Sequence, residues 1–145
     1  MRKVAFFVAL VFAGSAEQLP VRHYTTADGL AGNRIHCILR DSHGFLWFCT
    51  SEGLSRFDGY QFTNLTDAQG LPRNNVFDML ETREGTYWVG TSAGPVRYDP
   101  ARAESGTRFT LYSVGRRAAV VLLEDHSGAI WCGTSSYRGG TWSLT

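Results

Sequence analysis

This sequence lacks an excess of charge of either sign. Its 145 residues include 14 Lys and Arg against 13 Asp and Glu, for a formal net charge of +1, without a long charged run. A protein that binds nucleic-acid phosphates carries a basic patch, and a solvating tail carries a block of carboxylates. The charge balance therefore argues against both. At 43% hydrophobic and 13% aromatic residues, the composition is that of a globular protein.

The usual sequence signatures of catalysis and metal binding are missing too. No nucleophile lies near a base and an orienting residue, and there is no phosphate-binding glycine loop. The four histidines show no metal-ligand spacing and are interpreted as scattered surface residues. They are His23, His36, His43 and His126. We expect no catalytic residue, no metal and no cofactor.

Long apolar runs are confined to the N-terminus. Arg2 and Lys3 precede "VAFFVALVFAG" at residues 4–14, and small residues follow. This order predicts a secretory signal peptide over residues 1–16, cleaved after Ala16. A membrane anchor is the alternative, but the run is short for about 30 Å of hydrocarbon. We expect an exported protein, periplasmic or extracellular.

Cysteine is scarce, although an exported chain can form disulfides. The three cysteines are Cys37, Cys49 and Cys132. If residues 41–44 form a hairpin turn, paired positions sum to about 85, so Cys37 lies opposite Phe48 and Cys49 opposite His36. The thiols of Cys37 and Cys49 would then point to opposite faces of the sheet. We therefore expect no bridge between them and interpret all three as buried small apolar residues.

A tryptophan cassette recurs three times along the chain. Trp47, Trp88 and Trp131 are separated by 41 and then 43 residues, and the offset of 41 also maps "GLAGNRI" (29–35) onto "GLPRNNV" (70–76). Short apolar segments alternate with turn signals, and the 16 glycines fit many tight turns. A period of about forty residues is typical of a four-stranded propeller blade.

Each copy divides into short strands. The inner strands are expected at 34–40, 75–81 and 119–124, and the second strands at 45–50, 86–91 and 129–134. The second strands are apolar on both faces, which predicts neighbours on both sides of each sheet. The turns between these strands end in glycine, which can take positive φ; these are Gly44, Gly85 and Gly128. Third strands are expected at 54–58 and 95–99, and outer strands at 60–65 and 109–113.

The repeats predict an all-β fold, an incomplete β-propeller of about three four-stranded antiparallel blades. "HYTTADGL" (23–30) maps onto "NLTDAQGL" (64–71), so a lone outer strand should precede the first blade. The chain then stops partway through its third blade. The expected units are a signal peptide (1–16), a lone outer strand with its connecting loop (17–30), blade 1 (31–69), blade 2 (70–113) and a truncated blade 3 (114–145).

"GLAGNRIHCILRDSHGFLWFCTSEGLSRFDG" resembles the two-component regulator propeller repeat, whose pattern runs GL-P-x-N-x-V, D-x-x-G-x-LW-x-GT and GL-x-R-Y/F-D. The second copy matches with Thr82 in place of the usual Asp, and the third from Val120 onward. The resemblance implies the periplasmic sensor region of hybrid histidine-kinase-type signalling proteins. Because the sequence contains no kinase region, we expect a ligand-sensing or ligand-binding segment that is not itself an enzyme.

Two alternative functions remain open. One is a fragment of an exported propeller enzyme such as a polysaccharide lyase, and the other is a truncated product without independent function. The expected partners are further blades or a second subunit, together with a carbohydrate or another small-molecule ligand. No nucleic acid is expected, and a membrane would be reached only through a region downstream.

The loops that precede the inner strands cluster around the mouth of a propeller's channel and hold the candidate ligand-binding residues. These are Asn33, Arg34, Arg73, Asn74, Arg116 and Arg117. The arginines suit an anionic or sugar ligand, with a solvated loop charge as the alternative. For Asn33 and Asn74 we favour hydrogen bonding to the incoming turn. The repeated tryptophans are expected to fill the space between blades, and the turn glycines are likewise structural.

Overall fold

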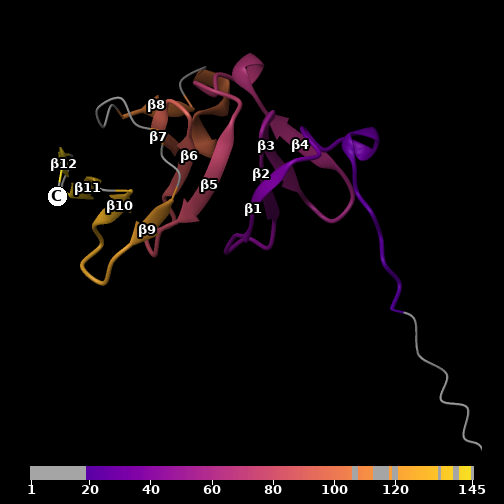
Figure 1. Cartoon of the computed structure of the whole chain (residues 1–145), viewed down its shortest axis with the longest axis horizontal. Helices are drawn as coiled ribbons and strands as arrows, with labels where there is room; N and C mark the ends of the chain where they lie inside the picture. The colour runs from indigo at the N-terminus through magenta and orange to yellow at the C-terminus, as the bar shows by residue number, and fades with distance from the viewer. Residues whose placement is uncertain are drawn as a thin grey trace, which may run out of the picture.

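The computed structural model describes residues 19–105, 108–112, 118, 121–133, 135–138 and 141–144. The predicted signal peptide and the candidates Arg116 and Arg117 lie outside the described residues. Three antiparallel sheets of four strands follow one another along the chain (Figure 1). Each sheet is a meander, because every strand pairs with the next one in sequence.

The strands lie close to the predicted segments. The first sheet contains β1 (Ile35–Arg40), β2 (Leu46–Thr50), β3 (Gly53–Phe57) and β4 (Phe62–Leu65). The second contains β5 (Val76–Glu81), β6 (Tyr87–Thr91), β7 (Gly94–Tyr98) and β8 (Phe109–Leu111). The third contains β9 (Leu122–Glu124), β10 (Ile130–Cys132), β11 (Ser135–Arg138) and β12 (Thr141–Leu144). Three short 3-10 helices are described: η1 (Thr26–Asp28) before β1, η2 (Asp67–Gln69) between the first two sheets, and η3 (Pro100–Ser105) between β7 and β8.

This architecture confirms the predicted fold class. The described part of the chain has strands and 3-10 turns only, and the three sheets form an open stack and not a closed ring. None of its helices has the length and hydropathy needed to cross a membrane. The third sheet has four strands, where a truncated blade was expected.

Side chains between neighbouring sheets form the core. We call the face of a blade toward the preceding blade its leading face, and the opposite one its trailing face. The largest cluster packs the trailing face of blade 1 against the leading face of blade 2: Trp47, Cys49, Leu54 and Leu65 meet Met79, Tyr87, Val89, Val96 and Tyr98. A smaller cluster joins blade 2 to blade 3: Trp88, Leu122, Ile130 and Cys132. Burial of these apolar surfaces holds the blades together.

Two of the three repeated tryptophans are deeply buried. Trp47 is 2% exposed and Trp88 is 3% exposed, whereas Trp131 on the last described trailing face is half-buried. The turn glycines Gly44, Gly85 and Gly128 take φ values of 90°, 78° and 81°, which a residue with a Cβ rarely adopts. Each hairpin therefore turns at a glycine and places a tryptophan three residues later.

Asp41 ties the first hairpin to the next blade. Its carboxylate is buried and accepts hydrogen bonds from Trp47 Nε1 (2.8 Å), the backbone N–H groups of His43 (3.0 Å) and Phe45 (2.9 Å), and the Tyr87 hydroxyl (3.1 Å). Burial raises the pKa of Asp41, but the hydrogen bonds from Trp47, Phe45, Tyr87 and His43 outweigh it and leave this pKa below its ordinary value.

The same arrangement returns in blade 3 and changes in blade 2. Asp125 accepts from Trp131 Nε1 (2.9 Å) and from the Ala129 N–H (3.0 Å). In blade 2 the hydroxyl of Thr82 accepts the N–H of Thr86 at 3.0 Å. A side-chain oxygen at this position therefore holds the hairpin turn in every blade, whether it belongs to a carboxylate or to a hydroxyl.

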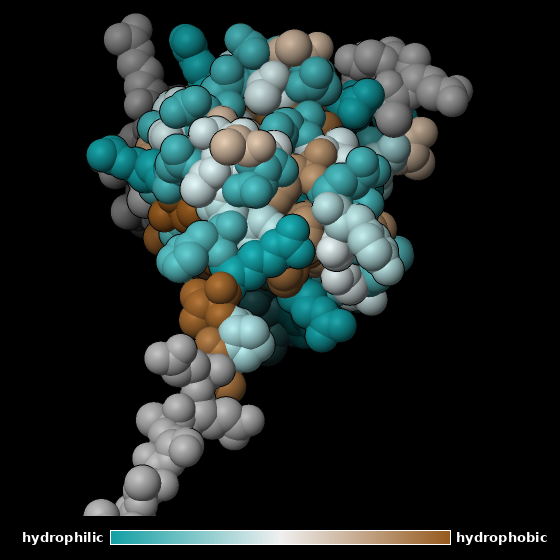
Figure 2. Space-filling model, turned by 90° about the vertical axis from the view of Figure 1, so that its right-hand side faces the viewer, coloured by the Kyte–Doolittle hydropathy of each residue, from teal (hydrophilic) through white to brown (hydrophobic). Residues whose placement is uncertain are grey.

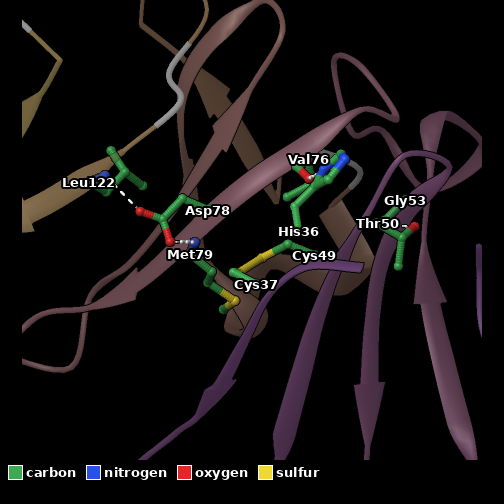
Figure 3. The surroundings of a disulfide bond; sticks show 9 residues. All are labelled: His36, Cys37, Cys49, Thr50, Gly53, Val76, Asp78, Met79 and Leu122. Atoms are coloured by element: carbon green, nitrogen blue, oxygen red, sulfur yellow. Dashed lines mark hydrogen bonds between the residues drawn. A yellow bond between two sulfur atoms is a disulfide. The ribbon is translucent and has the colours of Figure 1, made fainter. Parts of the chain in front are cut away.

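The structure contains a Cys37–Cys49 disulfide, so the cysteine prediction was wrong (Figure 3). The backbone closes the hairpin between Asp41 and Phe45, one position later than the expected register. Cys37 consequently lies opposite Cys49, with their Cα atoms 5.0 Å apart, and both thiols share one face. The free Cys132 is buried as expected. Its burial and, to a smaller extent, the negative charge of the nearby Asp78 raise the pKa of its thiol to about 11.

Residues 19–25 form no strand, in contrast to the expected lone outer strand. A strand of this kind needs an inner neighbour for its ladder hydrogen bonds, and the described residues provide none at this position. Tyr24 nevertheless packs on Phe57 and Phe62, with ring centroids 5.2 and 5.6 Å apart. Leu65, its equivalent in the repeat, lies in the same core cluster as Tyr98 of blade 2. The segment therefore takes the place of an outer strand without its ladder.

Loss of the disulfide should destabilise the chain. The bridge spans a sequence separation of 12 residues, and a bridge closing a loop of this order contributes about 2–4 kcal/mol by restricting the unfolded chain. We expect Cys37→Ala with Cys49→Ala to lower the free energy of unfolding by this amount in urea titrations. Dithiothreitol should cause a similar loss in the unmodified chain and none in the double variant. A chain whose unfolding ignores dithiothreitol would contradict the bridge.

Protonation of Asp41 should weaken the fold. Because its folded-state pKa lies below the ordinary 3.8, its contribution is present above that value and is lost as pH falls through the folded pKa. We expect Asp41→Asn to flatten the acid limb of the stability curve below about pH 4. It should also cost about 1–3 kcal/mol at neutral pH, since the amide brings a donor toward Trp47 Nε1. The pKa values of Asp58 and Asp125 are also lowered, so the variant should retain part of the decrease in stability toward acid pH. An unchanged acid limb in urea titrations would refute this role.

Candidate functional site

Asn33 and Asn74 hold the 3-10 turns that precede the inner strands. Asn33 Oδ1 accepts the N–H of Thr26 at 2.9 Å, and Asn74 Oδ1 accepts the N–H of Asp67 at 2.7 Å. Each turn is also closed by a capping box at its start. The two amides therefore perform the turn-binding role that the sequence analysis favours, and their carbonyl oxygens are engaged.

The arginines occupy non-equivalent positions in the same loops. Arg34 and Arg73 are both exposed. By the repeat offset of 41, Arg34 corresponds to Asn75 and Arg73 corresponds to Gly32. The Arg34 carbonyl accepts the N–H of Ser51 at 3.3 Å, which ties the start of β1 to the turn after β2. Their role in ligand binding stays a prediction.

A stacked ring pair lies at the start of the inner strands. The rings of His36 on β1 and Phe77 on β5 have centroids 5.4 Å apart and planes 24° from parallel. His36 Nδ1 lies 2.6 Å from the Val76 carbonyl oxygen (Figure 3). A carbonyl only accepts, so the proton belongs on Nδ1, which leaves Nε2 of a neutral ring as an acceptor. His36 is exposed and can offer that nitrogen to a ligand.

β-Bulges explain why these two rings face each other. The register shifts between Ile35 and Cys37 in blade 1 and between Val76 and Asp78 in blade 2. The extra residue of a bulge bends a strand and re-aims its side chain. The sequence analysis misses the pair because it treats His36 as a scattered histidine. The signal was present, since the offset of 41 aligns His36 with Phe77.

We call Arg34, His36, Asn75 and Phe77 the inner rim. Asn75 precedes β5, and its buried Oδ1 has no hydrogen-bond donor among the residues that the structure describes. The inner rim thus comprises guanidinium donors, an imidazole acceptor, an amide and a stacked pair of rings. Such groups bind ring-shaped polar molecules by stacking and hydrogen bonding. Across the described ranges, no three His, Cys, Asp or Glu side chains come together in a metal-binding arrangement.

A cavity of about 180 Å³ lies farther out, between blades 1 and 2. Its lining consists of Trp47, Arg56, Thr63, Leu65, Tyr98, Pro100 and Arg108. The Arg56 guanidinium carbon is 4.5 Å from the centre of the Phe45 ring, a cation–π contact. None of the candidate residues from the sequence lines this cavity, so it is separate from the inner rim.

Comparisons with known proteins identify the repeat. The model of the family described as Two component regulator propeller matches residues 29–52 and 70–93. Two segments of the chain therefore match this repeat, and the resemblance found in the sequence is confirmed. No curated protein sequence matches the chain.

A solved structure shares the fold. It is the extracellular domain of a hybrid two component system from B. thetaiotaomicron, with a TM-score of 0.74 and 21% sequence identity. The match covers 86% of this chain but only 18% of that domain, so the chain spans less than a fifth of its length. At this identity the similarity establishes the propeller-type fold of the stacked sheets.

Truncation of the loop amides should destabilise the turns. Because each carbonyl oxygen caps a backbone N–H, we expect Asn33→Ala and Asn74→Ala each to cost about 1 kcal/mol. Arg34→Ala, at an exposed neighbouring position, should stay within about 0.5 kcal/mol of the unmodified chain. Urea titrations measure all three. Equal stability of the asparagine variants and the arginine control would contradict the capping role.

Proposed function

We propose that this chain is an extracytoplasmic ligand-binding segment of a two-component sensor. It reaches its compartment through a signal peptide at residues 1–16 and acts by binding, without catalysis of its own. The single observation that supports the proposal most directly is the inner rim, where a bulge in each of the two matching segments brings the exposed His36 ring against the half-buried Phe77 ring.

The chemistry of the inner rim favours a carbohydrate. The His36–Phe77 stack offers an aromatic edge, and the imidazole Nε2 can accept a hydrogen bond from a sugar hydroxyl. The guanidinium of Arg34 donates to hydroxyl or carboxylate oxygens, and its hydrogen bonds to a carboxylate are about twice as strong as neutral ones. A sugar that carries a carboxylate is thus expected to bind more tightly than its neutral counterpart.

Signalling would follow from the way the rim is built. His36 on blade 1 contacts the Val76 carbonyl on blade 2, so the two halves of the rim belong to different blades. A ligand that bridges β1 and β5 stabilises one relative placement of the two sheets over others. A ligand shifts such an equilibrium by its difference in affinity for the two arrangements.

Oligosaccharide titration tests the proposal. Neutral and uronic-acid-containing oligosaccharides are titrated into the mature chain by isothermal calorimetry. We expect uronic-acid oligosaccharides to bind, His36→Ala and Phe77→Ala each to weaken them about 5–10-fold, and Arg34→Ala to weaken the acidic ones at least 10-fold. Arg97→Ala removes an exposed arginine outside the rim and serves as the matched control. Binding that survives all three rim variants, or no binding by any oligosaccharide, would overturn the proposal.

A further inference from the structure

Two blade–blade contacts use the same polar clamp. Between blades 1 and 2, the Ser42 N–H donates to Glu81 at 2.7 Å and the Ser42 hydroxyl donates to the other carboxylate oxygen at 2.5 Å. Between blades 2 and 3, the Arg83 N–H donates to Glu124 at 2.9 Å, and Arg83 Nε lies 3.3 Å from the same carboxylate. A hairpin-turn donor of one blade thus meets a carboxylate on the next.

The two clamps occupy equivalent positions in the repeat. Ser42 and Arg83 are 41 residues apart, each directly after the residue that holds its turn. Glu81 and Glu124 are 43 residues apart, each the last residue of an inner strand. The clamp is therefore a regular part of how one blade receives the blade before it.

Blade 1 has a cation at the corresponding position. Arg40 ends β1 as Glu81 ends β5 and Glu124 ends β9. It lies opposite Leu46 on the leading face, is exposed, and faces no carboxylate at ion-pair distance in the described part of the chain. A guanidinium has donors only, so it cannot accept a turn N–H. On the leading face of blade 1, a donor therefore stands at the position where blades 2 and 3 have a carboxylate acceptor.

The apolar part of the same face is open. Ile38 is 61% exposed, whereas its equivalents Met79 and Leu122 are 4% and 7% exposed beneath the preceding blade. Figure 2 views this side of the molecule and shows brown hydrophobic surface among the teal side chains. Ile38 therefore exposes apolar surface at a position that blades 2 and 3 bury beneath a neighbouring blade.

The N-terminal segment indicates what covers this face. Tyr24 already packs on Phe57 and Phe62 in the place that Leu65 takes against blade 2. An outer-strand position is thus occupied, and the three inner strands of the same blade are what the face lacks.

We propose that the leading face of blade 1 binds the inner strands of a further propeller blade whose hairpin turn carries Asp or Glu at the position of Ser42 and Arg83. That carboxylate pairs with Arg40, and the apolar side chains of the blade cover Ile38 and Phe48. The inference concerns assembly and does not depend on the ligand.

Arg40 also selects against a second copy of this chain. Blade 3 presents a trailing face with Leu123 60% exposed, and its clamp position is His126. If that blade stacked on blade 1 of another copy, the His126 N–H would point at the Arg40 guanidinium, donor against donor. Without Arg40, such head-to-tail contacts would extend into open stacks.

Charge reversal within the chain tests this selection. Arg40→Glu restores the acceptor found in blades 2 and 3, and His126→Glu gives blade 3 the acidic turn that Arg40 requires. We expect each single variant to self-associate at a concentration about 10-fold lower than the unmodified chain, measured by sedimentation velocity. The double variant R40E/H126E brings two carboxylates together and should return to the level of the unmodified chain. Arg73→Glu makes the same charge change in a loop and should have no effect.

The remaining outcomes overturn the proposal. If neither single variant associates more strongly, the charge at position 40 does not decide which hairpin turn can pack against this face. If the double variant associates as strongly as the singles, the effect is loss of charge and not pairing. If the unmodified chain already forms stacks that Ile38→Glu disperses, the face accepts a second copy and Arg40 does not exclude it. Far-ultraviolet circular dichroism confirms that each variant is folded.

Discussion

Each sheet in this chain has two apolar faces, and a face leaves water only when another blade lies against it. Blades 1 and 2 bury one shared layer in this way, with Trp47 and Leu54 on one side and Val89 and Val96 on the other. A second, smaller layer joins blades 2 and 3. Because a blade on its own would leave both of these faces in water, the blade–blade contact supplies apolar burial that a single blade lacks.

Polar groups at the edge of each layer set how the blades are placed. Apolar packing is non-directional, so it does not by itself fix the position of one sheet on another. Asp41 links its own hairpin to Tyr87 of the next blade, and Ser42 links the same turn to Glu81. These bonds come from one turn, so its conformation and the placement of blade 2 depend on each other.

Regular repetition made most of the scaffold predictable. The spacing of Trp47 and Trp88 located the strands of blades 1 and 2, and the turn glycines have the positive φ that their positions required. The disulfide was missed because pairing depends on the length of the turn to a single residue, and the register of Cys37 was assigned one position off. The sequence analysis also missed the two bulges, because an extra residue at the same position in both strands does not change the spacing of the repeat.

The candidate residues show where repetition stops being informative. Asn33 and Asn74 recur and are used for the scaffold, because every blade needs its incoming turn held. At His36 and Phe77, the same position carries different chemistry in two blades that share one backbone bulge. The bulge is then scaffold, while the ring it presents is free to differ. Arg40 and Glu81 are a second example, since they occupy equivalent positions at the ends of β1 and β5 and carry opposite charges. Within this fold, we therefore expect specificity at equivalent positions with unequal chemistry, since the stack itself requires only what every blade has in common.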